Sequence, residues 1–465
     1  MKRVLIITYY WPPSGGSGVQ RWLKFVKYLR EFGYEPVVYT PEDPEFMAID
    51  KTLEAEIPQG VEVVKRDILE PYSIYKILTG KRGKTLKPGF INTGGSGAKA
   101  VPLKERLSLF IRSNLFIPDP KCLWIGPSAR FLKKYLKENP VEAIVSTGPP
   151  HSMHLIAKRV SKATGIPWVA DFRDPWTKMY TFKYMGYSAP VVAIHKILEK
   201  SVVKSADAIV TVTETIGREL REMRRSGTNG TSGTNGTNEE RSRPNGSNDG
   251  ANYGVHIITN GFDNADFLSE TVPLDENFTI TYTGLFVRTQ NPTELWKMLA
   301  GRTRNNNVFA KDLKIRLIGH TDSAILEDIE RNGLGENLEQ LNYLPHTEVI
   351  KWQRSAQILL LSGGMEPESK GILTGKLFEY LAARRPILGF GPKGGDMDIA
   401  LSECEAGEMF DYNNKVAVAN WIDSRYEEYK GAGIPSVSGK IEKYSRRELT
   451  CAMAAVLDEI IERKK

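Results

Sequence analysis

The chain lacks the features of disulfide-bonded, metal-binding and membrane-spanning proteins. It holds three cysteines in 465 residues, Cys122, Cys404 and Cys451. Such an odd, scattered set argues against a disulfide framework and favours a reducing compartment. No Cys and His cluster has metal-ligand spacing. No apolar run approaches the roughly 20 residues of a membrane span, and the run at 4–8 is too short for a signal peptide. We therefore expect a cytoplasmic protein without a metal site.

The length and the apolar content indicate several folded domains. Apolar residues make up 41% of the chain, enough to fill buried cores. At about 150 residues per domain, 465 residues exceed one ordinary domain. We therefore expect at least two.

Charge is unevenly distributed along the chain. Residues 1–200 hold 31 Lys and Arg against 18 Asp and Glu, whereas the remainder holds 32 against 38. A basic first part favours an anionic partner, such as a membrane surface, nucleic acid or a phosphorylated ligand. No nucleic-acid-binding motif accompanies the charge. Contact with an anionic membrane is therefore the favoured interpretation, and solubilising surface charge is the alternative.

The stretch 358–392 has the pattern of a strand, a loop, a helix and a strand. An apolar run at 358–361 predicts a buried strand, and the loop at 362–374 contains Gly363, Gly364 and Gly371. Apolar residues at helical spacing then predict a helix over 376–384. In open α/β sheets such loops lie at the ligand-binding edge.

The residues that begin this helix are suited to an anionic ligand. Thr374, Gly375 and Lys376 stand where free backbone N–H groups and the helix dipole favour a diphosphate. Glu379 lies one turn further along on the same face, and a carboxylate there can accept hydrogen bonds from a ribose diol. The alternative is a solvated helix face with one Lys–Glu pair.

Two further loops follow predicted strands in the first half of the chain. The strand at 4–8 leads into a loop with Gly15 and Gly16, and this loop does not match the dinucleotide-binding fingerprint G-x-G-x-x-G. Strands at 143–146 and 167–170 precede His151 and the segment that contains Asp171, Arg173 and Asp174. These polar side chains are predicted to share the carboxyl edge of one sheet.

Several motifs resemble the retaining glycosyltransferases of family 4, in a branch that assembles bacterial surface polysaccharides. They are G-K-L-F-E-Y-L-A-A-R-R-P-I at 375–387, D-F-R-D-P-W at 171–176 and N-G-F-D at 260–263. The chain departs from the family at Gly371, where many members carry a first Glu. It also departs at Leu285 and Asn291, where members often carry Arg and Lys.

The resemblance implies an α/β fold of two Rossmann-like domains facing a cleft, the GT-B architecture. We expect an acceptor-side domain over 1–262, a donor-nucleotide domain over 263–443, and a final helix over 444–465 that crosses back to the first domain. The Gly-, Asn-, Ser- and Thr-rich segment 226–253 is predicted to be a disordered loop.

The resemblance also assigns roles to the candidate site residues. Catalytic roles fall to Lys376, Asp171 and His151. The donor nucleotide would contact Glu379, Lys376, Gly375, Thr374, Arg288, Gly284 and Gly16, with Arg288 replacing the missing basic residues. The acceptor would contact Gly15, His151, Asp171, Arg173 and Asp174, with Arg173 as a fork for an acceptor phosphate and either Asp orienting the acceptor hydroxyl.

The function that the resemblance implies is transfer of a hexosyl or N-acetylhexosaminyl group. The donor would be a nucleotide-diphosphate sugar, which is a co-substrate, so that no cofactor and no metal are expected. The acceptor would be a glycan or a polyprenyl-diphosphate-linked glycan, reached from the cytoplasm at the inner face of the membrane. The alternatives are a nucleotide-sugar epimerase and a non-catalytic nucleotide-sugar-binding or membrane-associated scaffold.

Overall fold

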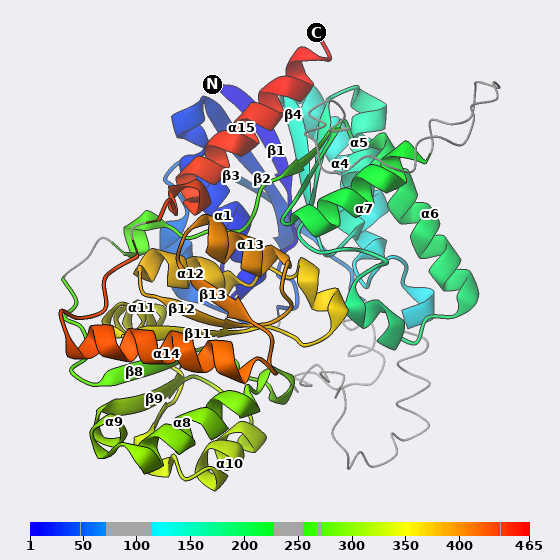
Figure 1. The fold of residues 1–465 in the computed structure, drawn as a ribbon. Helices are drawn as coiled ribbons and strands as arrows, with labels where there is room; N and C mark the ends of the chain where they lie inside the picture. The colour runs from blue at the N-terminus through cyan, green and yellow to red at the C-terminus, as the bar shows by residue number, and fades with distance from the viewer. Residues whose placement is uncertain (47, 71–112, 227–253, 268–270, 438) are drawn as a thin grey trace, which may run out of the picture. The chain divides into compact units, whose positions relative to one another are not determined.

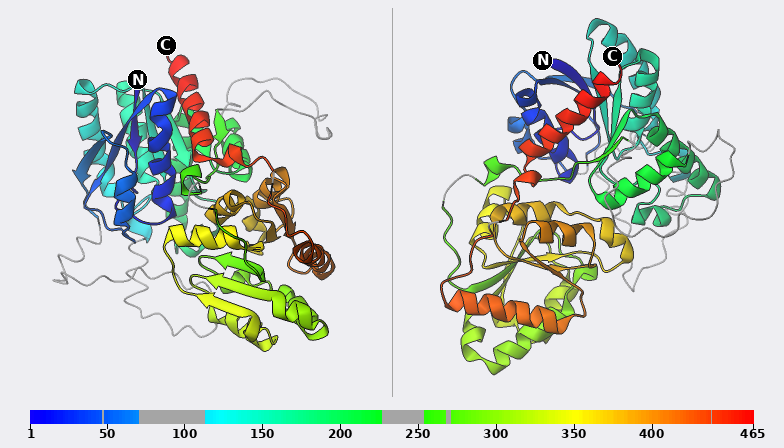
Figure 2. Two further views of the ribbon diagram at one scale, coloured as in Figure 1. Left: turned by 90° about the vertical axis from the view of Figure 1, so that its left-hand side faces the viewer. Right: turned by 45° about the horizontal axis from the view of Figure 1, so that its top comes forward.

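The computed structural model describes the whole chain except residues 47, 71–112, 227–253, 268–270 and 438. Nearly all of the predicted disordered loop 226–253 lies outside the described residues. The chain divides into two compact units. Unit 1 comprises Met1–Ile258 and Thr450–Lys465, and unit 2 comprises Thr259–Leu449 (Figures 1 and 2).

Unit 1 is built on a parallel sheet of seven strands in the order β3-β2-β1-β4-β5-β6-β7. The direction in which strands are added reverses between β1 and β4, which pair in parallel with Ile7 opposite Ser146. The strands are β1 (Lys2–Ile7), β2 (Tyr34–Glu42), β3 (Glu62–Asp67), β4 (Ala143–Gly148), β5 (Trp168–Phe172), β6 (Ala208–Thr211) and β7 (Val255–Ile257).

Helices cover this sheet because its central strands are apolar on both faces, as parallel strands with two buried faces are. One core packs alternate strand residues such as Leu5 and Ile7 against α4 to α7. The described α-helices of unit 1 are α1 (Ser17–Leu29), α4 (Ile125–Glu138), α5 (Ser152–Thr164), α6 (Ala189–Ser205), α7 (Glu214–Arg225) and most of α15 (Arg446–Glu462).

Unit 2 repeats the plan with a parallel sheet of six strands in the order β10-β9-β8-β11-β12-β13. Its strand order reverses between β8 and β11, where Ile358 pairs with Ile280. The strands are β8 (Phe278–Thr283), β9 (Leu313–Ile318), β10 (Leu338–Leu341), β11 (Ile358–Ser362), β12 (Ile387–Phe390) and β13 (Gly407–Phe410).

Two separate cores fill the space on the two faces of the second sheet. One packs strand residues against α8, α10 and α14, and the other packs strand residues against α12 and α13. The described α-helices of unit 2 are α8 (Thr293–Asn305), α9 (Asn307–Asp312), α10 (Ser323–Arg331), α11 (His346–Ser355), α12 (Gly375–Ala383), α13 (Asp396–Glu403) and α14 (Lys415–Lys430).

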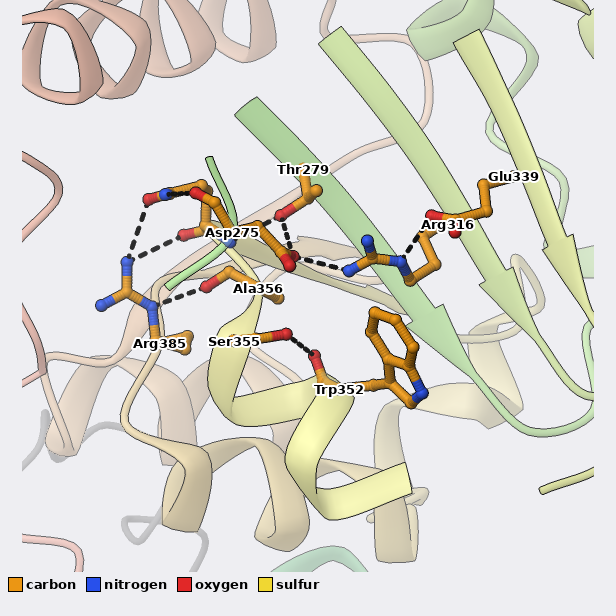
Figure 3. A network of polar contacts seen from close by, with 9 residues as sticks. Asp275, Thr279, Arg316, Glu339, Trp352, Ser355, Ala356 and Arg385 are labelled. Atoms are coloured by element: carbon orange, nitrogen blue, oxygen red, sulfur yellow. Dashed lines mark hydrogen bonds and ion pairs between the residues drawn. The ribbon is translucent and has the colours of Figure 1, made fainter. Parts of the chain in front are cut away.

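A polar network holds the amino-terminal edge of this second sheet (Figure 3). Asp275, just before β8, lies 2.5 Å from Arg316 of β9 and accepts a 2.9 Å hydrogen bond from Thr279. Arg316 also pairs with Glu339 at 2.7 Å and lies over the ring of Trp352. The network lies at the opposite edge of the sheet from the loops that follow the strands.

The two parallel α/β units confirm the predicted fold class. The stretch 358–392 is also close to its prediction, with β11 at Ile358–Ser362 and α12 at Gly375–Ala383. The apolar run predicts the strand and the helical spacing predicts the helix, because each element buries its apolar side chains in the core of its unit.

We predict that Leu457→Ala in α15 lowers the free energy of unfolding of unit 1 by about 2–5 kcal/mol. Leu457 is fully buried, and its neighbour Asp458 bonds to Lys2 and Tyr34 of unit 1. Urea unfolding measures the change. The matched control is Cys451→Ala on the exposed side of the same helix, which should stay within about 0.5 kcal/mol of the wild type. Equal effects of both variants would contradict the packing of α15 described here.

Candidate functional site

The first cluster of predicted residues lies where β11 leads into α12. The loop after β11 is fixed by Tyr412, whose hydroxyl lies 2.7 Å from Ser362 Oγ and donates to the carbonyl of Gly363 at 2.6 Å. Thr374 occupies the N-cap position of α12 with extended backbone angles, but its side chain makes no capping bond. Within the described part of the chain, Thr374 Oγ1 is buried without a hydrogen-bond partner. The start of α12 therefore keeps polar groups that a ligand can use.

Lys376 extends from α12 across the carboxyl end of β8. Its Nζ donates to the carbonyl of Leu285 at 3.0 Å and to the hydroxyl of Tyr282, and it lies 4.2 Å from the centroid of the Tyr282 ring. Burial lowers the pKa of Lys376 to about 8, although Glu379 opposes the shift. Gly284 makes this path possible, because a Cβ there would lie 2.9 Å from Lys376 Cε and its φ is +97°. Lys376 is thus a desolvated cation at the point where the strand order of unit 2 reverses.

Glu379 is held one turn further along α12 by a chain of hydrogen bonds. Its Oε2 accepts from Gln353 Nε2 at 2.9 Å, and the same nitrogen lies 3.1 Å from Thr283 Oγ1. The backbone N–H of Thr283 donates to the Tyr380 hydroxyl at 3.0 Å. The other oxygen, Oε1, lies 3.5 Å from Nε2 of the exposed His346. These hydrogen bonds therefore orient the Glu379 side chain, which remains partly exposed.

The loop after β8 brings Gly284 to Lys376 but leaves Arg288 apart. Arg288 is exposed and forms no hydrogen bond or ion pair with a described side chain. Leu285 contributes only its carbonyl, and its side chain is 54% exposed. Asn291 is buried, bonding to Asp328 at 3.0 Å and to Trp296 at 2.6 Å. Asn291 therefore has a structural role, and its amide is not available to a phosphate.

Asp171 in unit 1 is the most completely satisfied carboxylate among the predicted site residues. It is fully buried, and Arg21 of α1 approaches both oxygens, with Nη2 2.9 Å from Oδ1. Trp22 Nε1 and Thr147 Oγ1 donate to Oδ2 at 2.7 and 2.8 Å. Burial raises the pKa of Asp171, but the charge and hydrogen bonds of Arg21 outweigh it and leave the pKa below its usual value.

This geometry corrects the predicted role of Asp171. Both oxygens are occupied and the side chain has no exposure, so Asp171 is not placed to contact an acceptor hydroxyl. Arg21 Nη2 also donates to the carbonyl of Ile258 at 2.8 Å. The pair therefore joins α1 to β4, β5 and the segment after β7.

Arg173 and Asp174 leave the same strand in different environments. Arg173 donates to the carbonyls of Gly18, at 2.9 Å, and of Pro149. Its outer nitrogens thus join two loops, and its Nε has no hydrogen-bond partner among the described atoms, so its role as a phosphate fork stays a prediction. Asp174 is half-buried, and it makes no hydrogen bond or ion pair with a residue the structure describes. Burial raises the pKa of Asp174, with Arg173 opposing the shift. Asp174 is the carboxylate of this segment that remains available.

His151 lies at the start of α5 and is 9% exposed. Its ring stacks on Trp176 with centroids 4.2 Å apart and planes 3° apart. Burial lowers the pKa of His151 well below 6.5, so the ring is neutral at pH 7. Its Nδ1 is buried without a hydrogen-bond partner among the described atoms. A neutral imidazole in this place can donate or accept one hydrogen bond.

Sequence reasoning missed two histidines beside this ring. His154 Nδ1 lies 2.8 Å from Ser146 Oγ, which also accepts from Trp168 Nε1 at 2.8 Å. His195 Nδ1 accepts from Trp176 Nε1 at 3.1 Å. The spacing of three residues between His151 and His154 at a helix start is the signal that could have found the first of them.

Gly15 and Gly16 lie between β1 and α1, beside the strand-order reversal of unit 1. The N–H of Gly15 donates to the carbonyl of Ala48 at 2.9 Å. Gly16 is exposed with φ of +87°, a conformation that favours glycine, and no side chain caps α1. The two glycines thus shape an open turn at the start of a helix.

Within the described ranges, no group of three or more His, Cys, Asp and Glu side chains could hold a metal ion. Among the helices that the structure describes, none is long and apolar enough to cross a membrane.

One family and several solved structures are similar to this chain. Residues 95–229 match the family described as glycosyl transferase 4-like domain. Sucrose-phosphate synthase from Thermosynechococcus elongatus has a TM-score of 0.54 and 12% identity over 100% of this chain and 98% of that chain. The E. coli trehalose-6-phosphate structure bound with UDP-2-fluoro glucose has a TM-score of 0.53 and 12% identity over 98% and 99%. No curated protein sequence matches the chain.

A third structure with the same fold is an epimerase. The UDP-GlcNAc 2-epimerase from Methanocaldococcus jannaschii has a TM-score of 0.51 and 11% identity over 98% of this chain and 99% of that chain. At these identities the structures define the fold, which is GT-B. The family match adds support for a glycosyltransferase.

We predict that Asp171→Ala lowers the free energy of unfolding by about 3–5 kcal/mol, because it leaves the charge of Arg21 buried without the carboxylate that neutralises it. Chemical denaturation of unit 1 measures the loss. The control is Glu214→Ala, which removes an exposed pair with Arg221 and should cost no more than about 1 kcal/mol. A loss of the same size in both variants would show that the buried pair is not a structural centre.

Proposed function

We propose that this protein transfers a sugar from a nucleotide-diphosphate sugar to a glycan or lipid-linked acceptor. The observation that carries the proposal is the arrangement of Lys376 and Glu379 on α12, at the carboxyl ends of β8 and β11. Ligands of open α/β sheets bind at such a reversal of strand order. The match of residues 95–229 to the glycosyl transferase 4-like domain supports the reaction class.

In this proposal unit 2 binds the donor. The diphosphate lies at the start of α12, where backbone N–H groups of Thr374 to Lys376 and the helix dipole favour an anion. Lys376 moves from the carbonyl of Leu285 to a phosphate oxygen, and Glu379 accepts hydrogen bonds from the ribose. The E. coli neighbour bound with UDP-2-fluoro glucose supports a nucleotide-sugar donor.

The reaction breaks the bond between the anomeric carbon and the diphosphate oxygen and forms a bond from that carbon to the acceptor oxygen. We propose retention, with attack on the face that the diphosphate leaves. The acceptor proton passes to the departing diphosphate oxygen, so the step balances without a metal. Lys376 and the helix N–H groups stabilise the charge that develops on the leaving group.

Unit 1 binds the acceptor in this proposal. Asp174 is the available carboxylate and would orient the acceptor hydroxyl, and neutral His151 would contribute one hydrogen bond. A hexose or N-acetylhexosamine is the proposed sugar. A polyprenyl-diphosphate-linked glycan is the proposed acceptor, with peripheral contact between the basic first half of the chain and an anionic membrane, in surface-polysaccharide assembly.

The similarity to an epimerase structure supports one alternative function, which is epimerisation of a nucleotide sugar. An epimerase changes the sugar of the donor without an acceptor, and the M. jannaschii neighbour shows that the fold serves that activity as well. Incubation with each nucleotide sugar, followed by NMR of the sugar, separates the two. Epimerised donor in the absence of acceptor would replace the transferase proposal.

We predict that one of UDP, GDP or ADP and its sugars raises the melting temperature of the wild type. Lys376→Met should weaken that nucleotide about 10- to 100-fold, because a charged hydrogen bond to the diphosphate is lost. Glu379→Gln should weaken a ribonucleotide more than its 2′-deoxy form. The control is Lys440→Met, an exposed lysine outside the site, which should bind as the wild type does. No shift with any nucleotide would contradict the donor site.

We predict that donor affinity falls as the pH rises above about 8. The pKa of Lys376 is lowered to about 8 in the unliganded protein, so the charged form is complete below pH 7 and is lost through pH 9. Affinity for the nucleotide sugar should be nearly constant from about pH 6 to 7 and then fall by up to about tenfold per pH unit. Calorimetry at each pH measures this. Lys376→Met should show no such slope, and an unchanged wild-type affinity at pH 9 would contradict the prediction.

A further inference from the structure

A groove of about 560 Å³ lies on unit 1 between α4 and α5. It is lined by the small residues Gly126, Ala129 and Ala163. Four cations also line it, which we call the groove cations: Arg130 and Lys133 from α4, and Arg159 and Lys162 from α5. The two helices pack side by side on the same face of the sheet (Figure 1).

The groove cations have no acidic partners among the residues that the structure describes. All four are exposed, and no ion pair or hydrogen bond joins them to a described side chain. Other arginines of unit 1 are paired, such as Arg30 with Glu35 and Arg221 with Glu214. Helices α4 and α5 together carry seven Lys and Arg and one Glu. Like charges gathered in this way repel one another, and an anion in the groove removes that repulsion.

The neighbouring Lys158 is affected by the positive charges of the same helix pair. Lys158 precedes Arg159 on α5, and burial followed by the charge of Lys162 lowers the pKa of Lys158. Its Nζ donates to the carbonyl of Ser201 on α6 at 3.2 Å, so it is directed away from solvent. Lys158 is therefore not among the cations that the groove offers to a ligand.

The groove is separate from the predicted acceptor residues of unit 1. His151 lies just before α5, whereas Arg159 and Lys162 lie toward the other end of that helix. At 1.5 Å per residue, they are about 10–15 Å along the helix from Ser152. A ligand of the groove thus does not need to be the sugar acceptor.

The next helix of unit 1, α6, carries exposed apolar side chains next to lysines of its own. Ile194 and Ile197 are 41% and 66% exposed, and the exposed Lys196 and Lys200 stand among them. Helix α6 packs beside α5. Apolar side chains interleaved with lysines are typical of surfaces that lie in a membrane interface. This combination favours a lipid surface over a free phosphate ester as the source of the anion.

We propose that the groove between α4 and α5 binds the phosphate groups of anionic lipid headgroups and so holds unit 1 on an anionic membrane surface. The proposal gives a site to the peripheral membrane contact proposed above and rests on that contact. It does not rest on sugar transfer, because headgroup binding needs no donor.

The test is sedimentation with vesicles of phosphatidylcholine alone and with about 30% phosphatidylglycerol, at about 0.1 M salt. The wild type should bind only the anionic vesicles. Arg130→Gln with Lys162→Gln should bind them about 30-fold more weakly, since each basic residue near an anionic surface contributes about fivefold. The matched control is Arg304→Gln with Lys311→Gln, two exposed cations of unit 2 with the same loss of charge, which should bind as the wild type does.

The other outcomes overturn the proposal. Equal losses in both double variants would show that general charge, and not the groove, attracts the vesicles. No binding by the wild type, together with a thermal shift by glycerol phosphate that the groove variant lacks, would assign the groove to a soluble phosphate ester. No response to either ligand would leave the groove without a phosphate. A nucleotide thermal shift on the same variants reports the donor site separately, so that the failure of one proposal is distinguishable from the failure of the other.

Discussion

The buried pair of Arg21 and Asp171 is the interaction on which the carboxyl edge of unit 1 depends. Two charges with 1% and 0% exposure are tolerated only because each is bonded on several sides. Trp22 and Thr147 complete the shell of Asp171, and Ile258 accepts from Arg21. One ion pair thus holds the helix after β1 against β4, β5 and the end of β7. The loops that carry His151 and Asp174 begin from strands fixed in this way.

The environment of Lys376 in unit 2 differs from that of Arg21 in unit 1. Among the described residues Lys376 has no acidic hydrogen-bond partner, and it donates to the carbonyl of Leu285 and to Tyr282. A paired charge such as Arg21 stabilises the fold, whereas a desolvated charge held by neutral groups is stabilised when an anion binds. The groove cations are a third case, because they are exposed and gathered without an acidic partner in the described part of the chain. The environment of each cation, more than its presence, indicates what it does.

The sequence predicts the elements well because each depends on local pattern. Apolar runs mark the strands, and spacing along one helix places Glu379 near Lys376. It does not separate Asp171 from Asp174, because the choice depends on Arg21, which lies 150 positions away in the chain. The alternation of apolar and polar residues along the strand does not distinguish the two carboxylates, since β5 is buried on both faces. The carbonyl bonds of Arg173 and the packing of Asn291 were likewise beyond prediction, as both form only once distant loops meet.

The departure at Gly371 has a physical reading within the proposed reaction. Gly371 ends a short helical turn, Pro367–Gly371, and has no side chain with which to contact a sugar. The step that most needs assistance is the departure of a diphosphate, and that step requires positive charge. Lys376 has a pKa of about 8 when unliganded, and an adjacent diphosphate raises that pKa. The cation is therefore stabilised most as negative charge builds on the leaving group, which favours the transition state over the bound donor. A chain with glycine at position 371 therefore keeps Lys376, the cation on which departure of the diphosphate depends in the proposed reaction.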